Sequence, residues 1–163
     1  MTTHPPPRSG RVLALDHGER RIGYAWTDPL RIAAHPGGVL ERRSLKEDLE
    51  AIERLCAEQE VTLVIVGLPM NMDGSEGPQA AQARAFVQEV AAHLALPVKT
   101  FDERLTTVEA DRILDLEGVP RGGGRGRRLR LQRRDALAAS LLLEAYLGAS
   151  GGCPEAAGGR EES

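Results

Sequence analysis

The sequence of 163 residues is poor in the residues on which several common protein classes depend. Its two cysteines, Cys56 and Cys153, have no nearby cysteine or histidine partner, which excludes a zinc ribbon, a CxxC redox site and a disulfide framework. Aromatic residues make up 3% of the chain, too few for the stacking platforms that read single-stranded RNA. No apolar run approaches the ~18 residues of a membrane span, and residues 1–10 lack the apolar core of a secretory signal. We therefore expect a cytoplasmic protein that does not enter the membrane.

Motifs of covalent catalysis are also missing. No serine lies in a Gly-x-Ser-x-Gly elbow and neither cysteine is near a histidine, which argues against a covalent nucleophile. No Walker-type phosphate loop occurs. The four histidines are scattered without metal-ligand spacing, and of these only His17 is a candidate for contact with a substrate.

The composition is that of one globular domain. Hydrophobic residues make up 41% and charged residues 28% of the chain, which is typical of a folded protein of this size. Residues 1–10 are rich in proline, and residues 149–163 are rich in glycine, alanine and glutamate. We predict that both ends are disordered and that residues 11–148 form the domain.

Positive charge is concentrated in residues 121–134. This segment has seven arginines and no acidic residue, although the whole chain has a net charge of −3. Without those seven, 14 of the 21 basic residues remain against 24 acidic ones, a charge of −10. Arginine binds phosphate in a bidentate fork, so the segment predicts a surface for a polyanion, although a solvated, mobile loop would have the same composition. The seven are Arg121, Arg125, Arg127, Arg128, Arg130, Arg133 and Arg134.

The hydrophobic pattern predicts an α/β domain with a mixed sheet. Strands are predicted at 11–16, 22–27 and 32–40, joined by tight turns as an antiparallel meander, and again at 61–66 and 98–101. Helices are predicted at 45–55, 78–94, 106–118 and 134–147, with the glycine-rich residues 122–126 as a flexible hinge before the last one. Strands that begin as a meander and then alternate with helices give a mixed sheet with helices on its faces.

Acidic residues follow the ends of predicted elements. Asp16 ends the first strand, Asp102 and Glu103 end the strand at 98–101, and Asp135 begins the most apolar helix. Each has an ordinary alternative: a turn residue, a surface acid, or for Asp135 a salt bridge to a preceding arginine. Together they have the chemistry of a site for Mg²⁺, which prefers carboxylate, phosphate and water oxygens. Two such ions about 4 Å apart can activate a water and stabilise the leaving oxygen of a phosphodiester.

Four segments share an order and spacing with one known family. They are LALDHGERRIGYAWTD (13–28), VGLPMNMDGSEGPQA (66–80), FDERLTTVEA (101–110) and DALAASLLLEAYL (135–147). In these segments the chain resembles the YqgF/RuvX family of Holliday junction resolvases and pre-16S rRNA nucleases. The resemblance implies an RNase H-like fold, in which an antiparallel three-strand meander is followed by alternating helices and strands.

The resemblance also implies which residues are functional. Asp16, Glu103 and Asp135 are expected to bind Mg²⁺ or Mn²⁺ and to carry catalysis. Adjacent strand residues point to opposite faces, so either Asp102 or Glu103 could face the metal, and Glu103 is chosen by analogy with related resolvases. Nucleic acid is expected to bind a set of arginines: Arg104, Arg121, Arg125, Arg127, Arg128 and Arg130. The family usually has a short lysine-rich connection before the last helix, whereas this chain has a longer one of glycine and arginine, so its substrate preference could differ.

Three functions are compatible with these features. The leading hypothesis is a two-metal-ion endonuclease that processes the 5′ end of pre-16S rRNA or resolves branched DNA, and the sequence does not decide between them. The alternative is a non-catalytic nucleic-acid-binding factor of ribosome assembly. An ATPase of the actin and sugar-kinase type also has an Asp-x-Gly in its first strand, but it needs two such domains. Paired cuts in a four-way junction would suit a homodimer with two-fold symmetry.

Overall fold

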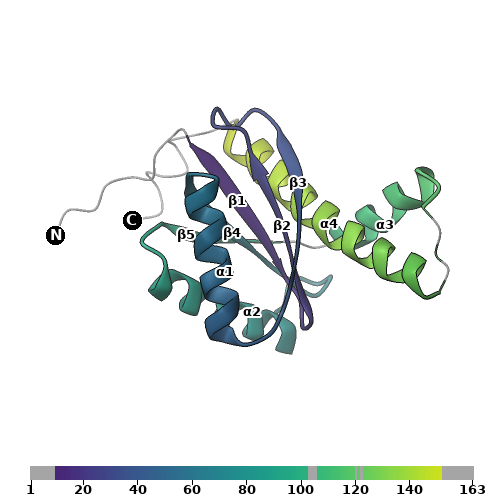
Figure 1. Ribbon diagram of the computed structural model, residues 1–163, viewed down its shortest axis with the longest axis horizontal. Coiled ribbons are helices and arrows are strands. Elements are labelled where there is room, and N and C mark those ends of the chain that lie inside the picture. The colour runs from purple at the N-terminus through teal and green to yellow at the C-terminus, as the bar shows by residue number, and fades with distance from the viewer. Residues whose placement is uncertain (1–9, 103–105, 120, 122, 152–163) are drawn as a thin grey trace.

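The structure is a computed structural model that describes residues 10–102, 106–119, 121 and 123–151 (Figure 1). Glu103 and Arg104, and the ends at residues 1–9 and 152–163 for which the sequence predicts disorder, lie outside the described residues. Within the described part of the chain, no helix combines the length and apolar content that crossing a bilayer requires.

One five-stranded mixed sheet forms the centre of the molecule, in the order β3-β2-β1-β4-β5. β1 (Arg11–His17), β2 (Arg21–Thr27) and β3 (Ala34–Glu41) are antiparallel neighbours. β4 (Val61–Leu68) runs parallel to β1, and β5 (Val98–Asp102) runs parallel to β4. The predicted antiparallel meander and the mixed sheet are confirmed.

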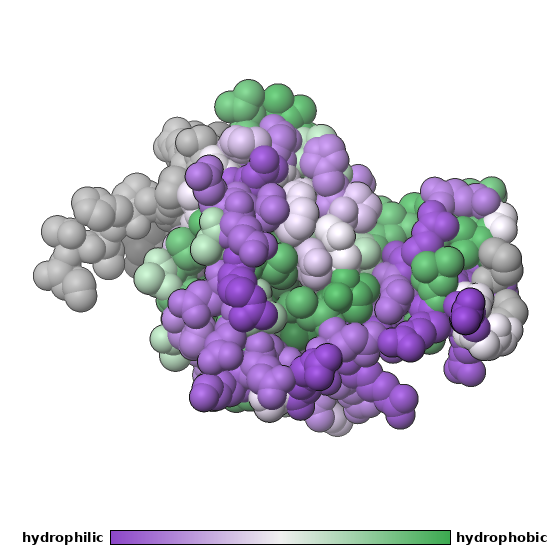
Figure 2. Space-filling view, in the orientation of Figure 1, coloured by the Kyte–Doolittle hydropathy of each residue, from purple (hydrophilic) through white to green (hydrophobic). Residues whose placement is uncertain are grey.

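Helices cover both faces of the sheet. α1 (Leu45–Glu58) and α2 (Pro78–His93) pack on one face, and α4 (Arg125–Gly151) packs on the other (Figure 1). α3 (Thr106–Leu116) packs against α4 rather than against the sheet. Figure 2 shows hydrophilic side chains over the outer surface of α1, as expected of a helix with one buried face.

Side chains of β1 alternate between the two helical layers. Leu13 and Leu15 belong to the core beneath α1 and α2, whereas Val12 and Ala14 belong to the core beneath α4. All four are fully buried, so β1 is covered on both faces. Because side chains alternate along a strand, Asp16 continues the series of Val12 and Ala14 and faces α4.

Ser44 and Glu47 have the spacing of a helix capping box, and the Ser44 hydroxyl accepts a hydrogen bond of 3.1 Å from the Glu47 backbone N–H before α1. The helical period of the sequence predicts a buried stripe of Leu45, Leu49, Ile52 and Leu55 on α1. Leu49 and Ile52 are buried as expected, but Leu45 is 42% exposed and Cys56 lies in the core. Leu45 is the first residue of the helix and lies beyond the edge of the packed face.

The flexible hinge predicted at residues 122–126 is wrong in its second half, because α4 begins at Arg125 rather than at Arg134. Residues 125–134 of α4 and helix α3 together form an arm that extends away from the sheet (Figure 1). Figure 2 shows this α3–α4 arm as a separate lobe. Arginines of α4 bind acidic side chains of α3, which supplies the stabilisation that the apolar pattern of this segment lacks.

Candidate active site at the end of the first strand

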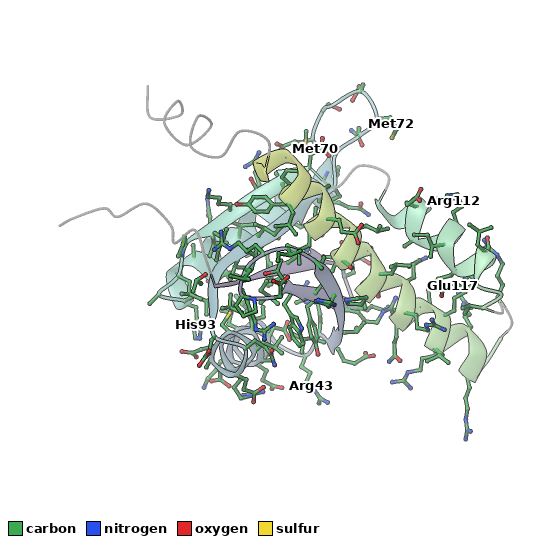
Figure 3. The ribbon with its side chains drawn as sticks, turned by 90° about the horizontal axis from the view of Figure 1, so that it is seen from above. Arg43, Met70, Met72, His93, Arg112 and Glu117 are labelled. Carbon is green, nitrogen blue, oxygen red and sulfur yellow. The ribbon has the colours of Figure 1, made fainter. Side chains whose placement is uncertain are left out.

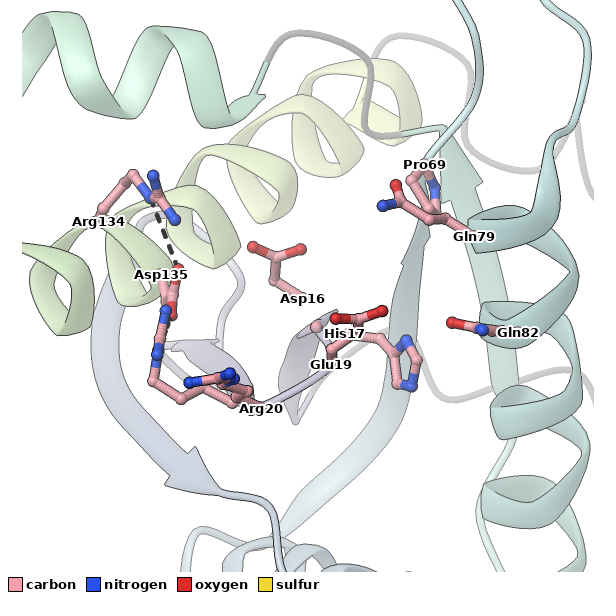
Figure 4. A pocket seen from close by; sticks show the side chains of 11 residues that line it. Asp16, His17, Glu19, Arg20, Pro69, Gln79, Gln82, Arg134 and Asp135 are labelled. Atoms are coloured by element: carbon pink, nitrogen blue, oxygen red, sulfur yellow. Dashed lines mark hydrogen bonds and ion pairs between the residues drawn. The ribbon is translucent and has the colours of Figure 1, made fainter.

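Asp16 and Asp135 line one pocket of about 400 Å³, at the end of β1 between α2 and α4 (Figure 4). The structure thus brings together two of the three acids that the sequence selects. Glu103 lies outside the described residues, and its neighbour Asp102 is not among the residues that line the pocket. The lining residues are Asp16, His17, Gly18, Glu19, Arg20, Arg21, Pro69, Gln79, Gln82, Arg134 and Asp135.

Gly23 allows Asp135 of α4 to lie close to the sheet beside Asp16. It is the cross-strand partner of Asp16 in the β1–β2 ladder, so the two residues share a face of the sheet. A Cβ atom on Gly23 would lie 2.2 Å from the backbone oxygen of Asp135 and 2.5 Å from its carbonyl carbon. Only glycine therefore permits α4 to lie this close to β2. Sequence reasoning missed this residue, although an isolated glycine within a strand is a known mark of close backbone approach.

Arg21 of β2 holds the carboxylate of Asp135. Its Nε lies 2.6 Å from Oδ2, and the Arg21 and Asp135 side chains are 22% and 15% exposed. The Nε of Arg134 lies 3.7 Å from the other oxygen, Oδ1. This Nε is buried and makes no hydrogen bond. The sequence predicts, as an alternative role for Asp135, a salt bridge to a preceding arginine. The structure has such a pair, with Arg134, but the shorter contact of Asp135 is with Arg21, more than a hundred positions earlier.

Asp16 and Asp135 have the donor chemistry that a hard divalent cation requires, namely carboxylate oxygens on separate rigid elements. Among the described residues, no three His, Cys, Asp or Glu side chains gather into a metal-binding set. A third carboxylate from the segment just after β5, where Glu103 lies, would complete such a set. The two described acids have the oxygen donors that Mg²⁺ or Mn²⁺ prefers, and both line the same pocket.

His17 is a neutral side chain fixed in the wall of the pocket. Burial, and then the charge of Arg42, lower its pKa from 6.5 to about 4, against a smaller opposing effect of Asp48. The Arg42 guanidinium lies 2.8 Å from Nε2 and can only donate, so Nε2 accepts and the ring proton resides on Nδ1. Arg42 is itself held by the buried Asp48, 3.2 Å away, and by the Gly18 carbonyl, 3.0 Å away. The Phe86 ring packs against the imidazole at 4.6 Å between centroids.

The opposite wall of the pocket carries two amides that the sequence analysis did not select. Gln79 and Gln82 lie on the first turns of α2, three residues apart and on one helix face. Figure 4 shows both side chains on the α2 side of the pocket, across from Asp135 on α4. An amide offers both a donor and an acceptor, so this wall can bind the sugar or base of a nucleotide.

The predicted arginine surface divides into two groups. Arg130 is 6% exposed and donates to the Val119 carbonyl at 2.6 Å and to Asp115 at 2.8 Å, so it stabilises the arm. Arg121 also binds Asp115, in a bidentate pair. Arg121 is itself exposed, as are Arg125, Arg127 and Arg128, but these three lack such a bidentate pair among the described residues. The predicted Arg104 lies outside the described residues.

Comparison with known proteins assigns the chain to a family. The family model described as "RuvX: Holliday junction resolvase" matches residues 10–149. Proteins named "Putative pre-16S rRNA nuclease" from Halothermothrix orenii and Moorella thermoacetica are each 44% identical over 137 residues, covering 84% of this chain and 94% of theirs. Among solved structures, T. thermophilus RuvC in complex with Holliday junction substrate has a TM-score of 0.49 and 15% identity, over 87% of this chain and 96% of that one. On the strength of the family model and of relatives matched along nearly their whole length, the chain belongs to the RuvX family.

Proposed function

We propose that the protein is a metal-dependent endonuclease that hydrolyses phosphodiester bonds in structured nucleic acid, either precursor 16S rRNA or branched DNA. The observation that carries the proposal is the convergence of Asp16 and Asp135 in one pocket bordered by arginines. The names of the relatives and of the family support a nuclease and these two substrates. A cytoplasmic location stays a prediction from the sequence.

Asp16, Asp135 and Glu103 would hold Mg²⁺ or Mn²⁺, in the two-metal-ion manner that the resemblance implies. When bound, such ions lower the pKa of water and stabilise the oxygen that leaves phosphorus. The carboxylate of Asp135 is already oriented by Arg21, and the close contact with Gly23 fixes its main chain. A strand and a helix, rather than loops, thus position Asp16 and Asp135, which is what precise metal chemistry requires.

The remaining pocket residues would bind and orient the substrate. Arg20, Arg21 and Arg134 line the pocket beside the acids and would neutralise the charge of the phosphate. His17 holds its proton on Nδ1, so it can donate a hydrogen bond to a phosphate or sugar oxygen but is not a base at neutral pH. Gln79 and Gln82 would contact the nucleotide from the α2 side.

Cleavage assays with matched variants test this function. Asp16→Asn and Asp135→Asn should abolish cleavage of a labelled 5′ fragment of precursor 16S rRNA or of a four-way DNA junction, in Mg²⁺ or Mn²⁺, while the proteins still bind. EDTA should stop cleavage by the wild type. Glu89→Gln makes the same chemical change on an exposed residue of α2 outside the pocket and should cleave normally. Full cleavage by Asp16→Asn would contradict the proposed role of this residue.

The same assay separates the competing functions. Binding of either substrate without cleavage by the wild type would identify a non-catalytic ribosome-assembly factor. Cleavage of the junction alone, by a dimer in sedimentation equilibrium, would identify a resolvase, because two symmetric cuts require paired active sites. Cleavage of the rRNA fragment alone would identify a processing nuclease.

A further inference from the structure

We propose that the face of α4 that carries Asp135 continues into the α3–α4 arm as a second contact for the phosphate backbone, at a fixed distance from the pocket. The contact residues are Arg128 and Arg125. The inference rests on the proposed function, which it deepens by specifying how the substrate lies on the protein. The length of α4 between Asp135 and these arginines would set the distance between the scissile bond and a second phosphate that the protein contacts.

The arm is rigid enough to serve this purpose. Arg130 donates to a backbone carbonyl and to the carboxylates of Asp111 and Asp115, so it joins α4 to α3 beneath the surface. Arg133 adds a pair with Glu117 at 3.3 Å. Figure 3 shows Arg112 on α3 and Glu117 just beyond its end, both beside the first half of α4. Since α4 is one continuous helix from Arg125 to Gly151, the arm and the pocket share a single rigid axis.

The periodicity of the helix aligns the arginines with the catalytic acid. Arg128 precedes Asp135 by seven residues, close to two full turns, and therefore lies on the same face. Arg125 lies three residues before Arg128, on an adjoining part of that face. Arg130 and Arg134 lie on a different face, which is turned toward Asp111 of α3.

Charge favours nucleic acid as the occupant of this face. Within the part of the chain that the structure describes, the acids of α3 are bound by other arginines: Arg112 binds Glu109, and Arg130 and Arg121 share Asp115. No ion pair is found there for Arg125, and Arg128 has only a long one, 3.8 Å to Glu41, with its own side chain 74% exposed. Such an exposed pair contributes little and can give way to a phosphate.

The helix rise sets the predicted spacing. At roughly 1.5 Å per residue, Arg128 lies about 10 Å and Arg125 about 15 Å from Asp135 along the axis. Nucleotides of a DNA strand follow each other at about 3.4 Å along the duplex. The arginine face should therefore contact phosphates about three to five nucleotides from the bond that is cut.

Binding and footprinting of a charge-reversed variant test the proposal. In Arg125→Glu/Arg128→Glu, affinity for a fluorescein-labelled four-way DNA junction should fall by about 10-fold or more, and the slope of log affinity against log salt by about two. A labelled 5′ fragment of precursor 16S rRNA, measured in parallel, shows whether the contact serves DNA, RNA or both. Hydroxyl-radical footprints on the Asp16→Asn background should lose protection three to five nucleotides from the position that the wild type cuts.

A control variant makes the result specific. Lys46→Glu/Arg54→Glu makes the same charge change on exposed residues of α1, on the other face of the sheet, and should bind nearly as the wild type does. Circular dichroism checks that both variants fold. Wild-type affinity and salt slope in Arg125→Glu/Arg128→Glu, for both DNA and RNA, would overturn the proposal. A wild type that binds but does not cut overturns the nuclease function instead, because the salt slope is measured without cleavage.

Discussion

The two halves of α4 are stabilised in opposite ways. From Ala136 onward the helix packs apolar side chains such as Leu142 and Leu143 against the sheet, and both are almost fully buried. Before Asp135 it packs arginines against the acids of α3, and its outward side chains are exposed. Asp135 lies at the boundary between these halves. One continuous helix can thus anchor Asp135, the proposed catalytic acid, beside a core and extend a charged surface beyond it.

Removing apolar packing from the second half should have the largest effect. Leu142→Ala deletes a side chain that is 1% exposed, and we expect the free energy of unfolding to fall by about 2–5 kcal/mol, from lost burial and the cavity left behind. Thermal or urea unfolding measures the change. Leu129→Ala, in the first half, removes a side chain that is 56% exposed and should change stability by about 0.5 kcal/mol or less. Equal losses in the two variants would contradict the comparison.

A larger side chain at Gly23, which contacts Asp135 at the boundary between the two halves of α4, should lower the free energy of unfolding less than Leu142→Ala does but lower activity more. In Gly23→Ala the new methyl group meets the main chain of Asp135, so β2 or α4 must shift, at a cost of about 1–3 kcal/mol. Cleavage and Mn²⁺ binding should fall even at temperatures where the variant is fully folded, because the spacing of Asp16 and Asp135 changes.

Gly126→Ala is the control for the boundary, since nothing lies within 4 Å of a Cβ atom at that position of α4. Its Mn²⁺ affinity should match that of the wild type, and its stability should match or slightly exceed it, because alanine favours a helix more than glycine does. A folded Gly23→Ala protein with wild-type Mn²⁺ affinity would show that Gly23 does not set the site.

Breaking the ion pairs between α3 and the first half of α4 should destabilise the α3–α4 arm without destabilising the sheet. Arg130→Met leaves Asp111 and Asp115 without their shared partner, and we expect a loss of about 1–2 kcal/mol, moderated by the exposure of both acids. Hydrogen exchange should accelerate in α3 but not in β1 or β4. Arg121→Gln removes an exposed pair and should change α3 exchange much less. Faster exchange throughout the sheet would contradict a separate arm.

The smallest effect concerns His17, whose pKa is lowered by burial and by the charge of Arg42. Its pKa is lower in the folded state than its ordinary value of 6.5, so unfolding takes up a proton between pH 6.5 and about 4. Stability is therefore complete above pH 6.5 and falls as the pH drops toward 4. The difference in pKa corresponds to about 3 kcal/mol, which partial exposure of the ring reduces to about 1–2 kcal/mol. Urea unfolding at pH 7 and 4.5 should show this loss in the wild type, and His17→Gln should lack it; identical pH profiles would contradict the assignment.

Much of the core follows from local patterns in the sequence. The apolar run at 61–66 predicts the central strand β4, and the acids at the ends of predicted elements point to Asp16 and Asp135. These signals are readable because burial imposes a period of two or 3.6 on the residues themselves. The predicted third acid, Glu103, stays a prediction.

Features that depend on a distant partner could not be predicted in this way. The first half of α4 has no apolar period, and its partners on α3 lie 15 and 19 positions earlier in the chain. The partner of Asp135 is Arg21, 114 positions away, and the importance of Gly23 depends on which helix covers it. Only the assembled fold supplies that information.

The contact at Gly23 has a consequence for how the family can diversify. The main chains of β2 and α4 set how closely Asp135 approaches the sheet, so pocket residues outside this contact can be exchanged without moving Asp135. Gln79, Gln82 or the arginine face could therefore be redesigned for a new substrate while the contact between Gly23 of β2 and Asp135 of α4 is kept unchanged.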